Sequence, residues 1–338
     1  MMTRDLWRNL ATLVAGALWA AAPARAESSA TVLHSAGDAL PGWAYAINPP
    51  AGPADAEAEA GDDTPHRVPG SAAVFTVAQV RDLFTAPDWH PDGHPAMPKI
   101  VAHGRRPQVF ACGYCHLPNG QGRPENSSLA GLAEGYILQQ LADFKSGARK
   151  SSEPRHVPAA LMIDVATKAC QLEIRAAAQY FSRLAPKPWI RVVETDSVEK
   201  TQVAGWMLVV SNPARLEPIG ERIIETPVDL ERTELRDDAS GFVAYVPVGS
   251  IKKGEWLVKT GDGGRTLQCA TCHGANLKGL GAAPAIAGRS PSYLVRQLYD
   301  IQHGARAGAG AELMTVPVAK LTLADMVSIA AYTASLRP

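Results

Sequence analysis

The final segment of the chain repeats apolar side chains with the period of an amphipathic α-helix. The residues on its apolar stripe are Leu323, Met326, Val327, Ala330 and Ala331. Thr322 stands directly before the stripe and Asp325 follows three residues later, which predicts an N-cap with an acidic variant of the capping box. A second helix is predicted over 250–261, where the sequence is SIKKGEWLVKTG.

Between 189 and 250 the pattern changes to short apolar runs that are typical of β-strands. The predicted strands cover 189–194, 203–210, 221–226 and 242–248. This connector is too long and too rich in strands for a simple linker. We therefore expect it to pack on the parts of the chain that flank it.

Residues 1–26 have the pattern of a signal peptide. Arg4 and Arg8 precede an apolar run, and a small-x-small sequence at 24–26 provides a cleavage site. The apolar run is too short to span a bilayer, and an N-terminal membrane anchor is the alternative. We expect a mature chain that begins near Glu27, has no transmembrane segment and resides in the periplasm.

The next segment, 27–94, is an N-terminal extension with little regular pattern. Residues 47–65 are rich in Pro, Ala and acidic side chains, which predicts a flexible linker. Residues 75–84 predict a short helix capped by Thr76. The histidine-containing stretch 88–95 is interrupted by proline and predicts a surface loop, because two histidines in one turn are too few ligands for a metal.

Length and composition are those of an ordinary globular protein. The 338 residues allow two or three domains, and 46% of them are hydrophobic. The formal net charge is zero, so nothing indicates a nucleic-acid partner.

Four of the five cysteines occur in two C-x-x-C-H sequences, at 112–116 and 269–273. A thioredoxin-like redox pair needs a βαβ context, which neither flank provides. A zinc site that combines the two pairs leaves both histidines without a role. The histidine directly after each pair favours covalent attachment of haem. The fifth cysteine, Cys170, stands outside both motifs, and we expect a partly buried structural thiol there.

The spacing of each motif suits haem chemistry. Cysteines at i and i+3 share one helical face, so both sulfurs reach the two vinyl groups of one haem. The histidine at i+4 then meets the iron as the proximal ligand. The residues at these positions are Cys112, Cys115 and His116 in the first motif and Cys269, Cys272 and His273 in the second.

The two motifs belong to an internal repeat. A shift of 157 residues places Cys112 on Cys269, and 14 of the 38 positions from Cys112 to Arg149 are identical in the two copies. After a slip of five residues the copies align again to the end of the chain. Arg149 and Arg306 match in this frame, which predicts contacts with haem propionates or with ordinary carboxylates.

One methionine has the same place in both copies. Met162 precedes Tyr180 by 18 residues, and Met314 precedes Tyr332 by the same number. A thioether is a soft ligand for haem iron, and His/Met ligation raises the reduction potential. Met162 and Met314 are therefore predicted as the second axial ligands. The alternatives are that they only fill the core, or that His156 serves in the first copy.

Together these features resemble the bacterial class I c-type cytochromes in tandem, and they are similar to the periplasmic di-haem cytochromes of the cytochrome c4 and c553 type. The resemblance covers about 95–188 and 251–338. One stretch of the second copy is similar to the family loop whose proline carbonyl accepts a hydrogen bond from the proximal histidine, which implies that Pro284 holds His273. The first copy has Ser127 in this place and departs from the family pattern.

The predicted fold is mainly α, with two cytochrome c-like haem domains from the internal repeat, joined by the β-rich connector. The predicted parts are the signal peptide (1–26), the N-terminal extension (27–94), the first cytochrome c domain (95–188), the connector (189–250) and the second cytochrome c domain (251–338). In the family the first helix of a domain packs across the last, which implies that 250–261 crosses the C-terminal helix.

The resemblance implies an electron carrier with two covalently bound haem c groups, whose His/Met ligands leave no open site for a substrate. Its expected partners are periplasmic redox proteins: a dehydrogenase as donor, and an oxidase or another cytochrome as acceptor. One alternative is a haem-bearing subunit of a periplasmic dehydrogenase or oxidase complex. The other is a di-haem enzyme of the thiosulfate dehydrogenase or peroxidase type. Some thiosulfate dehydrogenases ligate one haem by cysteine, but Cys170 aligns with the N-cap Thr322 and not with a ligand.

Overall fold

The computed structural model of the chain describes residues 39–50 and 63–338. The predicted signal peptide at 1–26 and most of the predicted linker at 47–65 lie outside the described residues.

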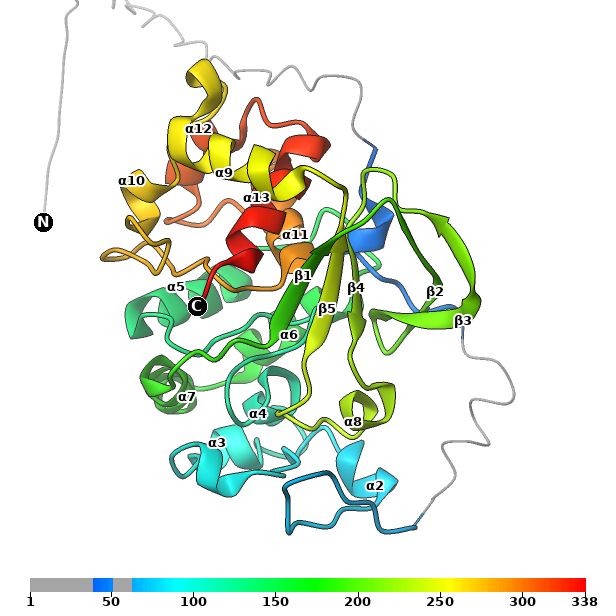
Figure 1. The fold of residues 1–338 in the computed structure, drawn as a ribbon. Coiled ribbons are helices and arrows are strands. Elements are labelled where there is room, and N and C mark those ends of the chain that lie inside the picture. Colours follow the sequence, from blue (N-terminus) through cyan, green and yellow to red (C-terminus); the bar gives the residue numbers. More distant parts are fainter. Residues whose placement is uncertain (1–38, 51–62) are drawn as a thin grey trace, which may run out of the picture. The chain divides into compact units, whose positions relative to one another are not determined.

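The first copy of the repeat consists of helices around its C-x-x-C-H motif (Figure 1). They are α3 (Lys99–Ala102), α4 (Cys112–His116), α5 (Glu134–Ser146), α6 (Val157–Lys168) and α7 (Gln171–Arg183). Val101, Ile137 and Phe181, from α3, α5 and α7, belong to one buried apolar cluster. Before this copy, α2 (Val77–Val80) begins at the predicted N-cap Thr76, whose side chain accepts a hydrogen bond from Gln79 N.

The second copy is built on a pair of crossed helices. Its helices are α9 (Ser250–Thr260), α10 (Ala270–His273), α11 (Pro291–Gln302), α12 (Thr315–Val318) and α13 (Leu323–Ser335). The close approach of α9 to α13 requires Gly254, because a Cβ there would lie 1.9 Å from the backbone oxygen of Ser328. Thr322 caps α13 and accepts a hydrogen bond from Asp325 N at 3.2 Å, so the predicted cap is confirmed.

Five strands lie between the two copies. They are β1 (Ile190–Glu194), β2 (Ser197–Ala204), β3 (Met207–Pro218), β4 (Ile224–Pro227) and β5 (Phe242–Val246), with the short helix α8 (Leu230–Glu234) between β4 and β5. In the sheet β1–β5–β4, β5 pairs in parallel with β1 and antiparallel with β4 (Figure 1). The strands β2 and β3 form a separate antiparallel pair.

The predicted strand over 203–210 is wrong, because the chain reverses direction in its middle. Gly205 and Trp206 both have a positive φ, of 58° and 60°, between the paired residues Ala204 and Met207. Two consecutive left-handed residues are the signature of a tight hairpin turn. The apolar run therefore forms the tip of the β2–β3 hairpin, and Trp206 stands at that tip.

Residues of the connector pack on both copies. Ala244 and Val246 of β5 are buried in one cluster with Leu257 of α9. Toward the first copy, the guanidinium of Arg236 lies 3.6 Å from the ring centroid of Tyr114 and donates a hydrogen bond to the Tyr114 backbone oxygen at 2.9 Å. A cation over an aromatic face, reinforced by a hydrogen bond, fixes this part of the connector against α4.

The loop predicted over 88–95 is exposed at Pro91, Asp92, Gly93 and Pro95, as a surface loop should be, but one of its side chains is buried. Trp89 is 1% exposed and packs with Val68, Val80 and Leu235. Its indole Nε1 donates a hydrogen bond to the Leu235 backbone oxygen at 2.7 Å. The prolines do interrupt regular structure here, but an indole with a satisfied N–H is a strong apolar anchor, and it holds the loop against the connector.

Among the described helices, none has by itself the length and apolar content to cross a membrane. A bent pair, Glu312–Val318 with Leu323–Ser335, meets these two requirements only when its members are taken together.

Candidate functional site

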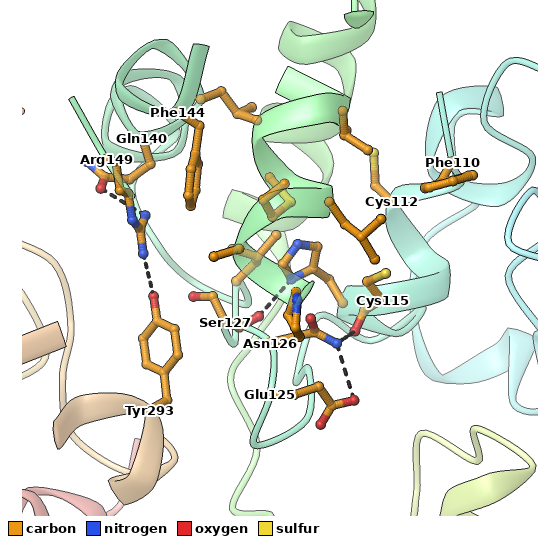
Figure 2. A pocket seen from close by; sticks show the side chains of 18 of the residues that line it. Phe110, Cys112, Cys115, Glu125, Asn126, Ser127, Gln140, Phe144, Arg149 and Tyr293 are labelled. Carbon is orange, nitrogen blue, oxygen red and sulfur yellow. Dashed lines mark hydrogen bonds between the residues drawn. The ribbon is translucent and has the colours of Figure 1, made fainter. Parts of the chain in front are cut away.

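The first C-x-x-C-H motif forms α4 and faces a pocket with a largely apolar wall. Cys112, Cys115 and His116 all line it. Figure 2 shows the two cysteines on one side of the pocket, and Arg149 and Tyr293 on the opposite side. Both thiols are free, and burial raises the pKa of the Cys112 thiol to about 12. The pocket therefore has a thiol side and a basic side.

The imidazole of His116 is held in one tautomer. Its Nδ1 lies 2.8 Å from the backbone oxygen of Ser127 (Figure 2). A carbonyl oxygen only accepts hydrogen bonds, so Nδ1 carries the proton and Nε2 keeps its lone pair. Burial also lowers the pKa of His116 to about 4, so the ring is neutral near pH 7. A neutral imidazole with a free Nε2 is the form that ligates iron.

The second motif repeats this arrangement. His273 Nδ1 lies 2.8 Å from the backbone oxygen of Pro284, so the contact implied by the family resemblance is confirmed. The departure at Ser127 leaves the contact in the first copy intact, because the acceptor is a backbone carbonyl that any residue supplies. Burial lowers the pKa of His273 and raises that of Cys269 to about 11.

The two predicted axial methionines occupy different local structures. Met162 lies within α6 and lines the same pocket as His116. Met314 ends a single 3-10 turn directly before α12 and packs, with Cys269, against the buried cluster of the second copy. Met162 thus shares a pocket with the motif of its own copy, and Met314 packs on the same apolar cluster as Cys269.

His156, the alternative ligand in the first copy, also lines this pocket. It stands at the N-cap of α6 and is 5% exposed. Neither of its ring nitrogens has a hydrogen-bond partner among the described residues. A buried imidazole with two unpaired nitrogens fits a pocket that receives a group with a polar edge.

The sequence predicted that the connector packs on its flanks, but not that residues of the connector and of the second copy line the first pocket. Trp206 and Arg236 of the connector line it, and so do Tyr293 and Arg296 of the second copy. Trp206 is fixed there by Asn48, whose Oδ1 accepts a hydrogen bond from the Trp206 backbone N at 2.8 Å. A non-glycine residue at positive φ is a useful indicator of such sites, but it is visible only in the structure.

The matched arginines of the repeat form one network that joins the two copies. Each guanidinium donates to a glutamine of its own copy and to a tyrosine of the other copy. The hydrogen bonds are Arg149 to Gln140 (2.9 Å) and Tyr293 (2.8 Å), and Arg306 to Gln297 (2.9 Å) and Tyr136 (2.8 Å). Each of these residues in the second copy is the one in the first copy shifted by 157 positions, so the network has an internal twofold pattern.

The expectation for Cys170 is wrong. Its side chain is exposed at the N-cap of α7, where its backbone N donates a hydrogen bond to Glu173 Oε2 at 2.8 Å. Cys170 does not line the pocket of His116.

No family model matches the chain. It is 25% identical over 234 residues to the thiosulfate dehydrogenase electron acceptor of Thiomonas intermedia (strain K12), which covers 68% of this chain and 80% of that protein. It is 24% identical over 241 residues to cytochrome c4 of Azotobacter vinelandii, over 67% of this chain and 84% of that protein. The chain is thus similar in sequence to a cytochrome c4 and to an electron acceptor of thiosulfate dehydrogenase.

The chain is also 24% identical over 240 residues to cytochrome c4 of Stutzerimonas stutzeri, over 67% of this chain and 84% of that protein. Among solved structures it is similar to thiosulfate dehydrogenase (TsdBA) from Marichromatium purpuratum, with a TM-score of 0.47 and 25% identity, over 71% of this chain and 39% of that one.

The residues of the first pocket fit a haem. The free thiols lie on one side, where vinyl groups form thioethers, and Arg149 lies on the opposite side, where propionates need a cation. Phe144 and Phe181 supply apolar wall between these sides. Haem is amphipathic in the same way, because its vinyl edge is apolar and its propionate edge is anionic.

Proposed function

We propose that the chain is a periplasmic electron carrier that passes single electrons between redox proteins through two His/Met haem c centres. One observation carries this proposal. In each copy a histidine directly follows two free cysteines and directs its Nδ1 to a backbone carbonyl at 2.8 Å. Because the two centres have the same proximal side, we assign both of them the same role, the exchange of electrons.

In this proposal the roles follow the repeat. The thioether cysteines and axial ligands are Cys112, Cys115, His116 and Met162 in the first domain (95–188) and Cys269, Cys272, His273 and Met314 in the second (251–338). The connector (189–250) joins the two domains, and the segment 1–26 directs export.

When bound, each haem supplies one iron that cycles between the ferric and ferrous states. The chain holds the proximal side rigid, because the backbone oxygens of Ser127 and Pro284 fix the histidine rings and raise their basicity. The apolar wall of the first pocket, with Ile137 and Phe181, excludes water, and solvent exclusion helps to set the potential of a metal centre. Met162 and Met314 would each supply a thioether to one iron, which would raise its potential and leave no position for a substrate.

The contacts between the copies support electron exchange within one chain. Lys150 N donates a hydrogen bond to Ala305 O at 2.7 Å, and Ala307 N donates to Ala148 O at 2.8 Å. These backbone bonds flank the twofold arginine network. These backbone hydrogen bonds and charged side chains hold the two copies against each other. They thereby keep the two haem sites at a constant distance and orientation, which electron transfer between them requires.

The donor that we propose is a periplasmic dehydrogenase of the thiosulfate dehydrogenase class, and the acceptor is an oxidase or another cytochrome. The support for this donor is the homologue whose name describes an electron acceptor of thiosulfate dehydrogenase.

Stopped-flow spectroscopy tests this function and separates a carrier from an enzyme. The oxidised protein is mixed with thiosulfate alone, and then with thiosulfate and a catalytic amount of thiosulfate dehydrogenase. We expect no reduction in the first mixture and full reduction, with two electrons per chain, in the second. Heat-denatured dehydrogenase is the control. Reduction by thiosulfate alone would mean that the chain is itself an enzyme, and no reduction in either mixture would exclude this donor.

A further inference from the structure

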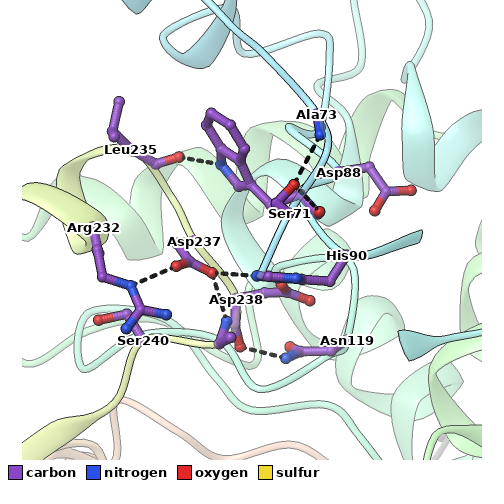
Figure 3. A network of polar contacts seen from close by, with 12 residues as sticks. Ser71, Ala73, Asp88, His90, Asn119, Arg232, Leu235, Asp237, Asp238 and Ser240 are labelled. Carbon is purple, nitrogen blue, oxygen red and sulfur yellow. Dashed lines mark hydrogen bonds and ion pairs between the residues drawn. The ribbon is translucent and has the colours of Figure 1, made fainter. Parts of the chain in front are cut away.

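Three side chains from distant parts of the sequence meet beside the loop that follows the first C-x-x-C-H motif (Figure 3). His90 comes from the N-terminal extension, and Asp237 and Asp238 come from the connector. One ligand atom from each lies within 4.8 Å of the other two. An imidazole nitrogen and two carboxylate oxygens form a donor set that zinc accepts.

The surroundings hold the first two of these groups in place. Asp237 is 2% exposed, and its Oδ1 lies 2.9 Å from His90 Nε2. Its Oδ2 accepts a hydrogen bond from Arg232 Nε at 2.7 Å, and its Oδ1 accepts one from Ala239 N at 2.9 Å (Figure 3). Outer groups of this kind orient the ligands of metal sites. The carboxylate and the imidazole are thus positioned by the protein itself.

Asp238 has a buried carboxylate oxygen without a hydrogen-bond partner among the described residues. It is 8% exposed, and its Oδ1 has no hydrogen-bond partner in the part of the chain that the structure describes. Its backbone oxygen, in contrast, is bonded to Asn119 Nδ2 at 2.6 Å, so the residue is firmly placed (Figure 3).

A second unpaired group lies on the same cavity wall. Gln121 lines one cavity together with His90, Asn119 and Asp238. It is 4% exposed, and its Nε2 bonds to none of the described residues. Buried amides and carboxylates are nearly always paired in proteins. Two such groups on one wall, beside a histidine and a second carboxylate, indicate a site for a polar ligand.

We propose that His90, Asp237 and Asp238 bind one zinc ion. A water molecule completes the four-coordinate set, and the amide of Gln121, which lines the same cavity as His90 and Asp238, is a candidate donor to that water. The two carboxylates balance the charge of the ion, and the pairing of Asp237 with Arg232 continues as an outer contact.

The position of the site places the zinc between two parts of the chain that are far apart in the sequence. It joins the N-terminal extension to the connector, and Asn119 links Asp238 to the loop three residues after His116. The ion therefore braces the loop of the first haem. This inference is independent of the proposed electron transfer, because it rests on residues outside the two haem motifs.

Calorimetry on the tag-free, haem-loaded protein tests the site. The protein is stripped with EDTA, dialysed and titrated with zinc chloride. We expect one zinc per chain and a rise in the melting temperature with zinc. Loss of an outer contact alone weakens metal binding about 10–100-fold. We therefore expect Asp238→Asn to weaken it by at least about 100-fold. The matched control is Asp92→Asn, an exposed carboxyl in the same loop, which should bind zinc as the wild type does.

Further outcomes decide the remaining cases. Zinc binding at wild-type strength in both Asp238→Asn and His90→Gln would place the ion elsewhere and overturn the proposal. Calcium or magnesium that displaces zinc at equal concentration would overturn the choice of metal. If the variants do not fold, the wild type decides, since one tightly bound zinc with a raised melting temperature supports the site and no binding overturns it. A shift in the potential of the first haem alone on zinc removal would support the bracing role.

Discussion

The two copies of the repeat differ least at their histidines and most in what surrounds them. His116 and His273 are 7% and 6% exposed, and each lies 2.8 Å from a backbone oxygen. The residue after each histidine has a positive φ, of 63° at Leu117 and 82° at Gly274. Leucine is strained in this conformation, at a cost of about 1–3 kcal/mol. The two copies therefore share the same backbone conformation after the histidine, although the leucine side chain of the first copy disfavours it.

The surroundings differ because each copy completes its core in another way. The second copy packs the long helix α9 across α13 through Gly254, whereas α3 of the first copy is a single turn. The first copy instead recruits Trp206 and Arg236 of the connector to its pocket. Tandem domains with equal haem motifs can thus depend on different parts of one chain for stability.

The largest effect should come from the motif cysteines. The double substitution of Cys112 and Cys115 by alanine removes both thioether sulfurs of the first copy, so we expect the covalent haem content to fall from two per chain to one. Pyridine haemochrome spectra of denatured protein measure this ratio. Cys170→Ala is the matched control, because that thiol is exposed and outside the motifs. Two covalent haems in the double variant, or a loss in the control, would contradict the assignment.

The helix crossing in the second copy should respond strongly to one added methyl group. In Gly254→Ala the new Cβ meets the backbone oxygen of Ser328, which cannot move unless α9 and α13 separate. We expect a loss of about 1–3 kcal/mol or more in the free energy of unfolding, measured by denaturant titration.

The control for this substitution is Gly135→Ala in α5, where no atom lies within 4 Å of the added Cβ. We expect it to be neutral or to stabilise by about 0.4–1 kcal/mol. Equal losses in the two variants would mean that helix propensity, and not the crossing, sets the effect.

The two predicted axial methionines should each account for about half of one absorption band. We expect the weak red absorption band of Met-ligated ferric haem to fall by about half in Met162→His and by about half in Met314→His, since each methionine would ligate one of two irons. The potential of the altered haem should fall, because imidazole replaces the thioether. An unchanged spectrum in Met162→His would transfer the ligand role to His156, which lines the same pocket.

The smallest effect should be the symmetric one. Tyr136→Phe and Tyr293→Phe each remove the oxygen that accepts a hydrogen bond from an arginine of the other copy. We expect equal losses of about 0.5–1.5 kcal/mol in the free energy of unfolding, because each arginine nitrogen keeps a glutamine acceptor. In the double variant the losses should not simply add, because the arginines share Gln140 and Gln297. A large loss of stability in only one of the two single variants would show that the two hydrogen bonds, although equivalent in geometry, contribute unequally to stability.

Much of this site could be predicted from short-range sequence features. The motifs, the repeat, the cap at Thr322 and the contact of Pro284 with His273 all depend on residues close together in the sequence, or on a family pattern. The equivalent contact of Ser127 could not be predicted from residue type, because its acceptor is a backbone oxygen. The sequence also gave no sign of contacts across long separations, such as His90 with Asp237, which are 147 residues apart.

Carbon monoxide binding tests the central claim, that both irons are closed by a ligand from the chain and serve only to carry electrons. The reduced protein is equilibrated with carbon monoxide at neutral pH, and its spectrum is compared with that of the Met162→Ala and Met314→Ala variants, each of which opens one iron. The account predicts almost no change in the wild type and one equivalent of carbon monoxide bound in each variant. Rapid, stoichiometric binding to either haem of the wild type would contradict it and indicate an enzyme with an open iron.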